Sequence, residues 1–296
     1  SYWHWHTIHY GAENYWGGIL NHDLGPNRCY RELSRLGHEL KQHGSLLTDL
    51  KVDADVAFLY SEDSRYAREF QPCLKAPGSA MPDGASYQRV FNAFYRSFFD
   101  ARAQDWERYP LLMAPALYVA DDALLARLVR YAENGGHLVL TFRAAYEDEH
   151  CRARWQQAPG PLRKAVGASY NEYSNLVLPL GLRPGEGSLT LSPEAKAEAW
   201  ADGLELEGAT ALAYYDHPHF GRFPAITTQP FSKGRVTYIG TLPNQALGKA
   251  LAGWVMEQSG IAPLGIGLPE PVRCNTARSA DGKRLWFWTN WSYAPQ

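Results

Sequence analysis

The chain has 296 residues, with 29 Lys or Arg against 31 Asp or Glu, so its formal charge at pH 7 is -2. Without a basic excess to neutralise a phosphate backbone, we expect no nucleic-acid partner. The longest apolar runs fall short of the ~18 residues of a membrane span. No secretory signal pattern opens the sequence either, so we expect a soluble protein with no membrane partner.

The four cysteines, Cys29, Cys73, Cys151 and Cys274, lie far apart and form no CxxC pair. This spacing favours neither a zinc knuckle nor a dense disulfide framework. We therefore expect a reducing, cytoplasmic environment and neither a metal ion nor a cofactor.

Aromatic residues gather near both ends of the chain, which contains 10 Trp and 18 Tyr. Flat aromatic faces suit sugar rings. Aromatic residues that alternate along a strand are nevertheless more often core or cross-strand pairs, and we prefer that interpretation for the C-terminal group.

The first 44 residues predict one strand, one long loop and one helix. Aromatic residues and histidines alternate from Tyr2 to Thr7 as in a strand, and Gly17-Gly18 interrupts the pattern. Pro26 then opens a helix that ends near Gly44, with an apolar stripe at Cys29, Leu33, Leu36 and Leu40. Such a unit buries too little apolar surface to be a domain alone.

Short apolar strands alternate with amphipathic helices between residues 54 and 262. The predicted strands are Ala54 to Tyr60, Leu111 to Ala114, His137 to Phe142, Ala209 to Tyr215, Ala225 to Thr228 and Arg235 to Thr241. The predicted helices follow Ser86, Asp121 and Asn244. This alternation favours an α/β fold whose mostly parallel sheet is flavodoxin-like and covered on both faces.

Two segments depart from that repeat. Only seven residues, Gln104 to Pro110, separate a predicted helix from the next strand, which indicates a missing or very short edge strand. The segment from Cys151 to Pro193 has weak periodicity, and we expect it to be rich in loops. Near the C-terminus, two alternating segments flank Asp281-Gly282, a strong hairpin signal.

The N-terminal segment also carries a distinctive motif, YWHWHxxHYGAExYWGGxLxHDLxPNRxYRE. Its histidines His4, His6 and His9 are spaced unfavourably for one metal ion, because strand alternation turns only the first two to the same face. A carboxylate on a glycine-flanked loop beside tryptophans is a plausible acceptor for sugar hydroxyls.

This motif resembles the end of the catalytic barrel in glycoside hydrolase family 42 β-galactosidases. The resemblance continues through Tyr109 to Tyr118 and Gly135 to Thr141 into the trimerisation domain of that family, and through Val272 to Ser292 into its C-terminal β-domain. It implies three parts: residues 1–52 as the last unit of a (β/α)8 barrel, 53–262 as the trimerisation domain, and 263–296 as the start of a β-domain.

The resemblance implies a retaining hydrolysis of terminal β-galactosides by a homotrimer. The family uses two glutamates about 5 Å apart, and neither of their motifs occurs in this sequence, so no catalytic residue is assigned. Glu13 matches a third glutamate that binds galactose hydroxyls. Trp16 replaces a histidine found in some members, and would contribute stacking to the same substrate site.

Two other interpretations remain. The chain could be a non-catalytic oligomerisation or carbohydrate-binding protein. The middle fold also resembles class I glutamine amidotransferases, which need a cysteine on the turn that here reads Arg143-Ala144-Ala145. Cys151 follows that turn too late in the chain, so we do not favour this activity.

Overall fold

A computed structural model describes residues 4–12, 14, 17–98, 106–262, 269 and 271–292, with the side chains of residues 96–98 excepted. The chain divides into two compact units, which are described separately. Unit 1 comprises residues 1–53 and 269–296, and unit 2 comprises residues 54–268.

In unit 1, the predicted helix forms as α1 (Arg28–Leu47). The side chain of Asn27 caps it by accepting a hydrogen bond from the Tyr30 amide at 2.9 Å. The helix continues past Gly44 and ends where Thr48 becomes extended, so the predicted end was one turn too early. None of its side chains is buried.

Unit 1 also contains a three-stranded antiparallel sheet in the order β1-β12-β13. Its strands are β1 (Lys51–Val52), β12 (Val272–Arg278) and β13 (Arg284–Asn290). The predicted hairpin is confirmed: β12 pairs with β13 across a turn in which Gly282 has φ +82°. Asp53, next to β1, forms ion pairs with Arg278 and Arg284, which fastens β1 to both strands of the hairpin.

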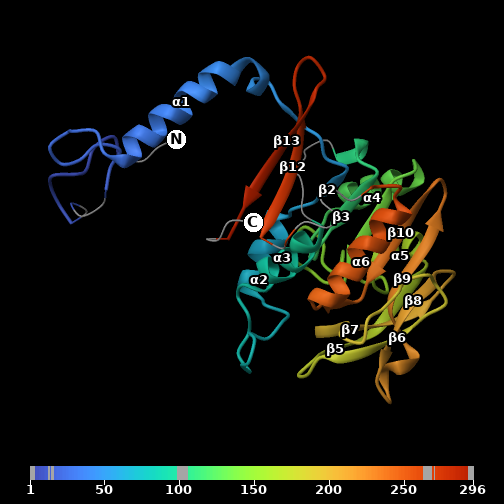
Figure 1. The fold of residues 1–296 in the computed structure, drawn as a ribbon. Helices are drawn as coiled ribbons and strands as arrows, with labels where there is room; N and C mark the ends of the chain where they lie inside the picture. Colours follow the sequence, from blue (N-terminus) through green and yellow to red (C-terminus); the bar gives the residue numbers. More distant parts are fainter. Residues whose placement is uncertain are drawn as a thin grey trace. The chain divides into compact units, whose positions relative to one another are not determined.

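Unit 2 is built on a ten-stranded sheet in the order β11-β7-β6-β8-β9-β10-β4-β3-β2, with β5 paired to β7 (Figure 1). One part is parallel, formed by β2 (Val56–Phe58), β3 (Leu111–Ala114), β4 (His137–Thr141) and β10 (Gly234–Ile239). These strands lie where the continuous apolar runs predicted them.

The other part of the sheet is antiparallel. Its strands are β5 (Ala168–Asn175), β6 (Leu180–Pro184), β7 (Lys196–Leu206), β8 (Thr210–Asp216), β9 (Pro224–Phe231) and β11 (Thr241–Pro243). The expectation of a mostly parallel sheet was therefore wrong, and the sheet is mixed. The segment predicted as loop-rich contains β5 and β6, whose mostly exposed or half-buried side chains gave no continuous apolar run.

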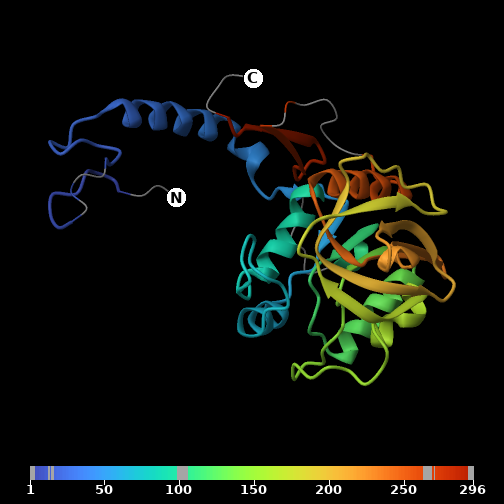
Figure 2. The same ribbon diagram turned by 90° about the horizontal axis from the view of Figure 1, so that it is seen from below.

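Helices cover both faces of this sheet. Successive strand residues point to opposite faces, so Leu111 and Met113 join one apolar cluster while Leu112 and Ala114 join the other. The first cluster lies under α3 (Ser86–Phe98) and α6 (Gln245–Gln258), and the second under α4 (Asp122–Glu133) and α5 (Arg163–Val166). Figure 2 shows α6, in orange, and α4, in green, on opposite sides of the sheet.

Helix starts in unit 2 follow simple capping chemistry. Asp121 and Asn244 accept hydrogen bonds from the backbone amides of Leu124 and Leu247, which places α4 and α6 where the sequence predicted them. A further helix, α2 (Glu62–Phe70), was not predicted, because its short polar sequence carries little apolar periodicity. Within the described part of the chain, β2 forms the edge of the sheet next to β3. Of the segment Gln104 to Pro110, in which a short edge strand was considered, Trp106–Arg108 forms a 3-10 helix, and residues 104–105 lie outside the described residues.

Candidate functional site

The predicted substrate-binding residues Glu13 and Trp16 lie outside the described residues. The backbone on either side of them is held together. His6 forms a parallel bridge with Leu20, and the Thr7 amide donates to the Leu20 carbonyl at 3.1 Å. A Cβ atom on Gly18 would lie 2.3 Å from the carbonyl carbon of His6, so only glycine permits this approach.

The histidines of this segment make contacts with one another and with the backbone. The rings of His9 and His22 stack with centroids 5.6 Å apart, and His9 Nε2 hydrogen-bonds the carbonyl oxygen of His22 at 2.7 Å. Among the described residues, no three His, Cys, Asp or Glu side chains form a group that could hold a metal ion. The histidines are thus accounted for by packing and hydrogen bonding.

In unit 2, the turn after β4 is the place where an amidotransferase would carry its nucleophile. Arg143 stands there instead, in the left-handed region with φ +56°. Its guanidinium carbon lies 3.9 Å from the ring centre of Tyr146, and the rings of Tyr173 and Trp200 also lie within cation–π range. Cys151 is exposed on the following loop. The turn therefore presents a cation packed among aromatic rings and no thiol.

Beside this turn, Asp202 is a fully buried carboxylate on β7. It accepts hydrogen bonds from Trp200 Nε1 at 2.7 Å, from the Tyr238 hydroxyl at 2.9 Å and from the Arg143 amide at 3.3 Å. Burial raises its pKa to about 6, although these donors and the nearby Arg143 favour the charged form. The cluster ties β7, β10 and the β4 turn together, which is a structural role.

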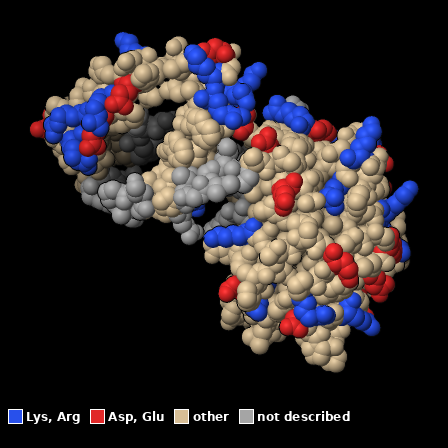
Figure 3. Space-filling view, turned by 45° about the vertical axis from the view of Figure 1, so that its right-hand side comes forward, with Lys and Arg blue, Asp and Glu red and all other residues tan. Residues whose placement is uncertain are grey.

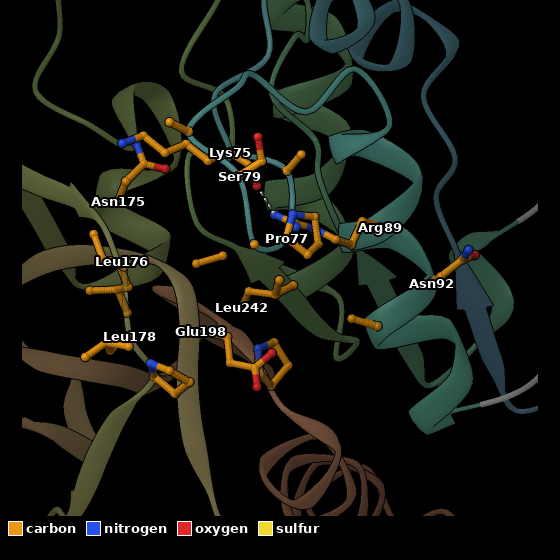
Figure 4. A pocket seen from close by; sticks show the side chains of 18 residues that line it. Lys75, Pro77, Ser79, Arg89, Asn92, Asn175, Leu176, Leu178, Glu198 and Leu242 are labelled. Atoms are coloured by element: carbon orange, nitrogen blue, oxygen red, sulfur yellow. Dashed lines mark hydrogen bonds between the residues drawn. The ribbon is translucent and has the colours of Figure 1, made fainter.

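A hollow in unit 2 has a volume of about 840 Å³ (Figure 4). One wall comes from the loop at residues 75–80 and from α3, where the Arg89 guanidinium donates to the Lys75 carbonyl oxygen at 3.2 Å. The opposite wall comes from the loop between β5 and β6, with the exposed apolar side chains of Val177 and Leu178. Glu198 also lines the hollow.

Charged side chains of both signs are interspersed over the face of unit 2 shown in Figure 3. Within the described ranges, no helix is long and apolar enough to span a membrane.

Residues 54–262 match the family of β-galactosidase trimerisation domains. The chain is 26% identical over 298 residues to the β-galactosidase BgaA of Clostridium cellulovorans, covering 97% of this chain and 43% of that protein. It is 28% identical over 252 residues to the β-galactosidase BgaB of Geobacillus kaustophilus, covering 82% and 36%. The chain thus spans about two fifths of the length of these relatives.

Solved structures show the same fold. The cold-adapted β-galactosidase of Rahnella sp. R3 superposes with a TM-score of 0.83 at 23% identity, covering 97% of this chain and 43% of that one. The β-galactosidase of Halorubrum lacusprofundi gives a TM-score of 0.77 at 27% identity, covering 97% and 41%.

Proposed function

The chain belongs to the family of β-galactosidase trimerisation domains, and from this membership we propose that it is the C-terminal portion of a family 42 β-galactosidase. The observation that carries the proposal is the match over residues 54–262. Two β-galactosidases support it, because about two fifths of the length of each relative aligns with nearly the whole of this chain. In this interpretation unit 2 assembles copies of the protein, and the enzyme acts in the cytoplasm.

The N-terminal segment would form one wall of the galactose site, as the last strand, loop and helix of a (β/α)8 barrel. Glu13 would accept hydrogen bonds from sugar hydroxyls, and Trp16 would stack on the ring. The exposed apolar stripe of α1 fits this role, because a barrel helix buries such a stripe against its neighbours. Retaining hydrolysis needs two further glutamates, which this chain does not supply, so we expect it to be inactive alone.

The assembly we propose is a homotrimer with cyclic symmetry. Head-to-tail contacts close into a ring, so each copy would use two different surfaces of unit 2. We also propose that the segment from β2 to β4 keeps a flavodoxin-like arrangement. In it, α3 leads to β3 and α4 leads to β4, and each strand pairs in parallel with the strand before it.

Two measurements test the proposal. Light scattering on a protein that also carries the upstream coding region should give three times the mass of one copy, and the mass of one copy over a hundredfold concentration range would remove the assembly role. A chromogenic β-galactoside should be hydrolysed by a protein that also carries the upstream coding region, and not by these 296 residues alone.

Inactivity of the longer protein would favour the non-catalytic carbohydrate-binding or oligomerisation alternative. Turnover by the 296-residue chain, abolished by Glu13→Gln, would contradict the proposed division of labour, since it would require a catalytic pair within this chain.

A further inference from the structure

The loop between β4 and β5 carries a tryptophan, Trp155, whose side chain is fully exposed. Its neighbour in the chain is firmly fixed. The Arg154 amide donates to the Tyr146 carbonyl oxygen at 3.0 Å, and the Arg154 guanidinium donates to Asp122 Oδ1 and to the Ala120 carbonyl oxygen, each at 2.6 Å. The exposed indole therefore projects from an anchored backbone.

Trp155 borders a hollow of about 210 Å³ within unit 2. Pockets that bind drug-sized ligands have volumes of ~300–1,000 Å³, so this hollow is of a size for a single small ring. The residues that line it are mostly aromatic rings and amides: Ala145, Tyr146, Arg154, Trp155, Gln156, Gln157, Ala158, Gly160, Tyr170, Asn171 and Tyr173.

The aromatic wall of the hollow is supported from behind. The rings of Tyr146 and Tyr173 meet edge to face with centroids 6.4 Å apart. Tyr173 stacks on Trp200 at 5.3 Å, and the Arg143 guanidinium lies over Tyr146. Rings held in this way lose little conformational entropy when a ligand packs against them.

The polar groups of the hollow suit a neutral ligand. The amides of Gln156 and Asn171 are exposed and have no hydrogen-bond partner among the described residues, so each offers donors and an acceptor. Arg154 is the only charged side chain among the lining residues. The two terminal nitrogens of its guanidinium are engaged by Asp122 and the Ala120 carbonyl, and its Nε is buried. An anionic ligand would find no free cation in this lining.

We propose that this hollow binds a neutral saccharide through one pyranose ring. The C–H face of the ring would stack on Trp155, and its hydroxyls, each a donor and an acceptor, would bond the amides of Gln156 and Asn171. The inference goes beyond the proposed function, since it places a sugar site in unit 2. It does not depend on Glu13 or Trp16.

The test is a titration of the 296-residue chain with methyl β-D-galactoside and methyl β-D-glucoside, followed by ligand-observed NMR. We expect a dissociation constant of about 1–10 mM, as for a small ligand with few contacts. Trp155→Ala should weaken binding about fivefold or more, through loss of the stacking face. The combined change Gln156→Ala and Asn171→Ala should also weaken it.

The matched control is Trp291→Ala, because Trp291 is an exposed tryptophan of unit 1. It should leave the affinity unchanged. Absence of binding at 50 mM of either glycoside, a limit set ~5-fold above the weakest expected constant, would overturn the proposal. Binding of the glycosides that Trp155→Ala does not alter would also overturn it.

Discussion

Arg68 on α2 donates through Nη2 to Glu147 Oε2 at 2.5 Å, and the two side chains are 3% and 9% exposed. The same guanidinium lies over the ring of Tyr118, 5.3 Å from its centre. The pair joins the short helix α2 to the loop after β4, across 79 positions of sequence.

Removing one partner of this pair should be costly. Glu147→Ala leaves the Arg68 cation buried without its carboxylate, so we expect a loss of about 3–5 kcal/mol in the free energy of unfolding, measured by urea denaturation. Glu172→Ala removes an exposed partner of Arg222 at 2.9 Å and should cost less than about 1 kcal/mol. Equal losses of stability in the two variants would show that burial does not increase the cost of breaking the Arg68–Glu147 pair.

Two buried groups should give unit 2 opposite responses to acid. His137 lies between Ser259 and Thr237, and burial, followed by the charge of Arg235, lowers its pKa to about 3. Below pH 6.5, its ordinary pKa, His137 is protonated in the unfolded chain but stays neutral in the folded chain. As the pH decreases below this value, the free energy of unfolding therefore decreases by about 1.4 kcal/mol per pH unit. Asp202, with a folded pKa of about 6 against 3.8, keeps a proton that the unfolded chain has lost. Its contribution rises as pH falls from about 6 to 4.

Single substitutions should separate these contributions. As the pH decreases from 6 to 4, His137→Gln should become steadily more stable relative to the wild type, by about 1.4 kcal/mol per pH unit. Asp202→Asn should become steadily less stable by about the same amount. Urea denaturation at a series of pH values measures both. Parallel curves for wild type and variants would contradict the burial assigned to these groups.

Substitution by alanine at two glycines of unit 2 should change stability in opposite directions. At Gly234, in β10, a Cβ atom would lie 2.3 Å from the Gly136 carbonyl oxygen and 2.4 Å from that of Ala132, so Gly234→Ala should destabilise by about 1–3 kcal/mol. At Gly253, an exposed position of α6 with open space around it, alanine should stabilise by about 0.5–1 kcal/mol. Thermal unfolding of both variants compares them directly.

The role proposed for Glu13 predicts a kinetic effect in the longer enzyme. Glu13→Ala would remove a charge-assisted hydrogen bond to a sugar hydroxyl, worth about 1.5–3 kcal/mol in the transition state. We expect kcat/KM to fall about 10- to 150-fold. Wild-type values of kcat/KM in this variant would show that Glu13 does not bind the substrate.

Sequence reasoning located the elements whose burial is complete. All four residues of β3 and all five of β4 are buried, and continuous apolar runs of this kind are readable without knowing their partners. In contrast, β5 buries three residues and exposes five, and its pairing with β7 depends on contacts distant in sequence. Such half-exposed strands resemble loops until the partner strand is known.

The features around the β4 turn were less predictable still. Arg143, Tyr173 and Trp200 come from three separate segments, so their contacts follow from the topology and not from any local pattern. Trp155, followed by Gln156 and Gln157, did carry a local signal, an aromatic residue beside two amides in a polar segment. For Glu13 and Trp16, the sequence motif remains the only support.

The position of β10 between β4 and β9 has a consequence for synthesis of the chain on the ribosome. After β4 emerges at Thr141, about ninety residues must follow before β10 begins at Gly234. At roughly 5–20 residues per second, the nascent parallel strands would wait for about 5–20 s with the edge of β4 that later pairs with β10 still open. Open strand edges are templates for wrong pairing between chains, so this interval is where a growing polypeptide most needs a chaperone.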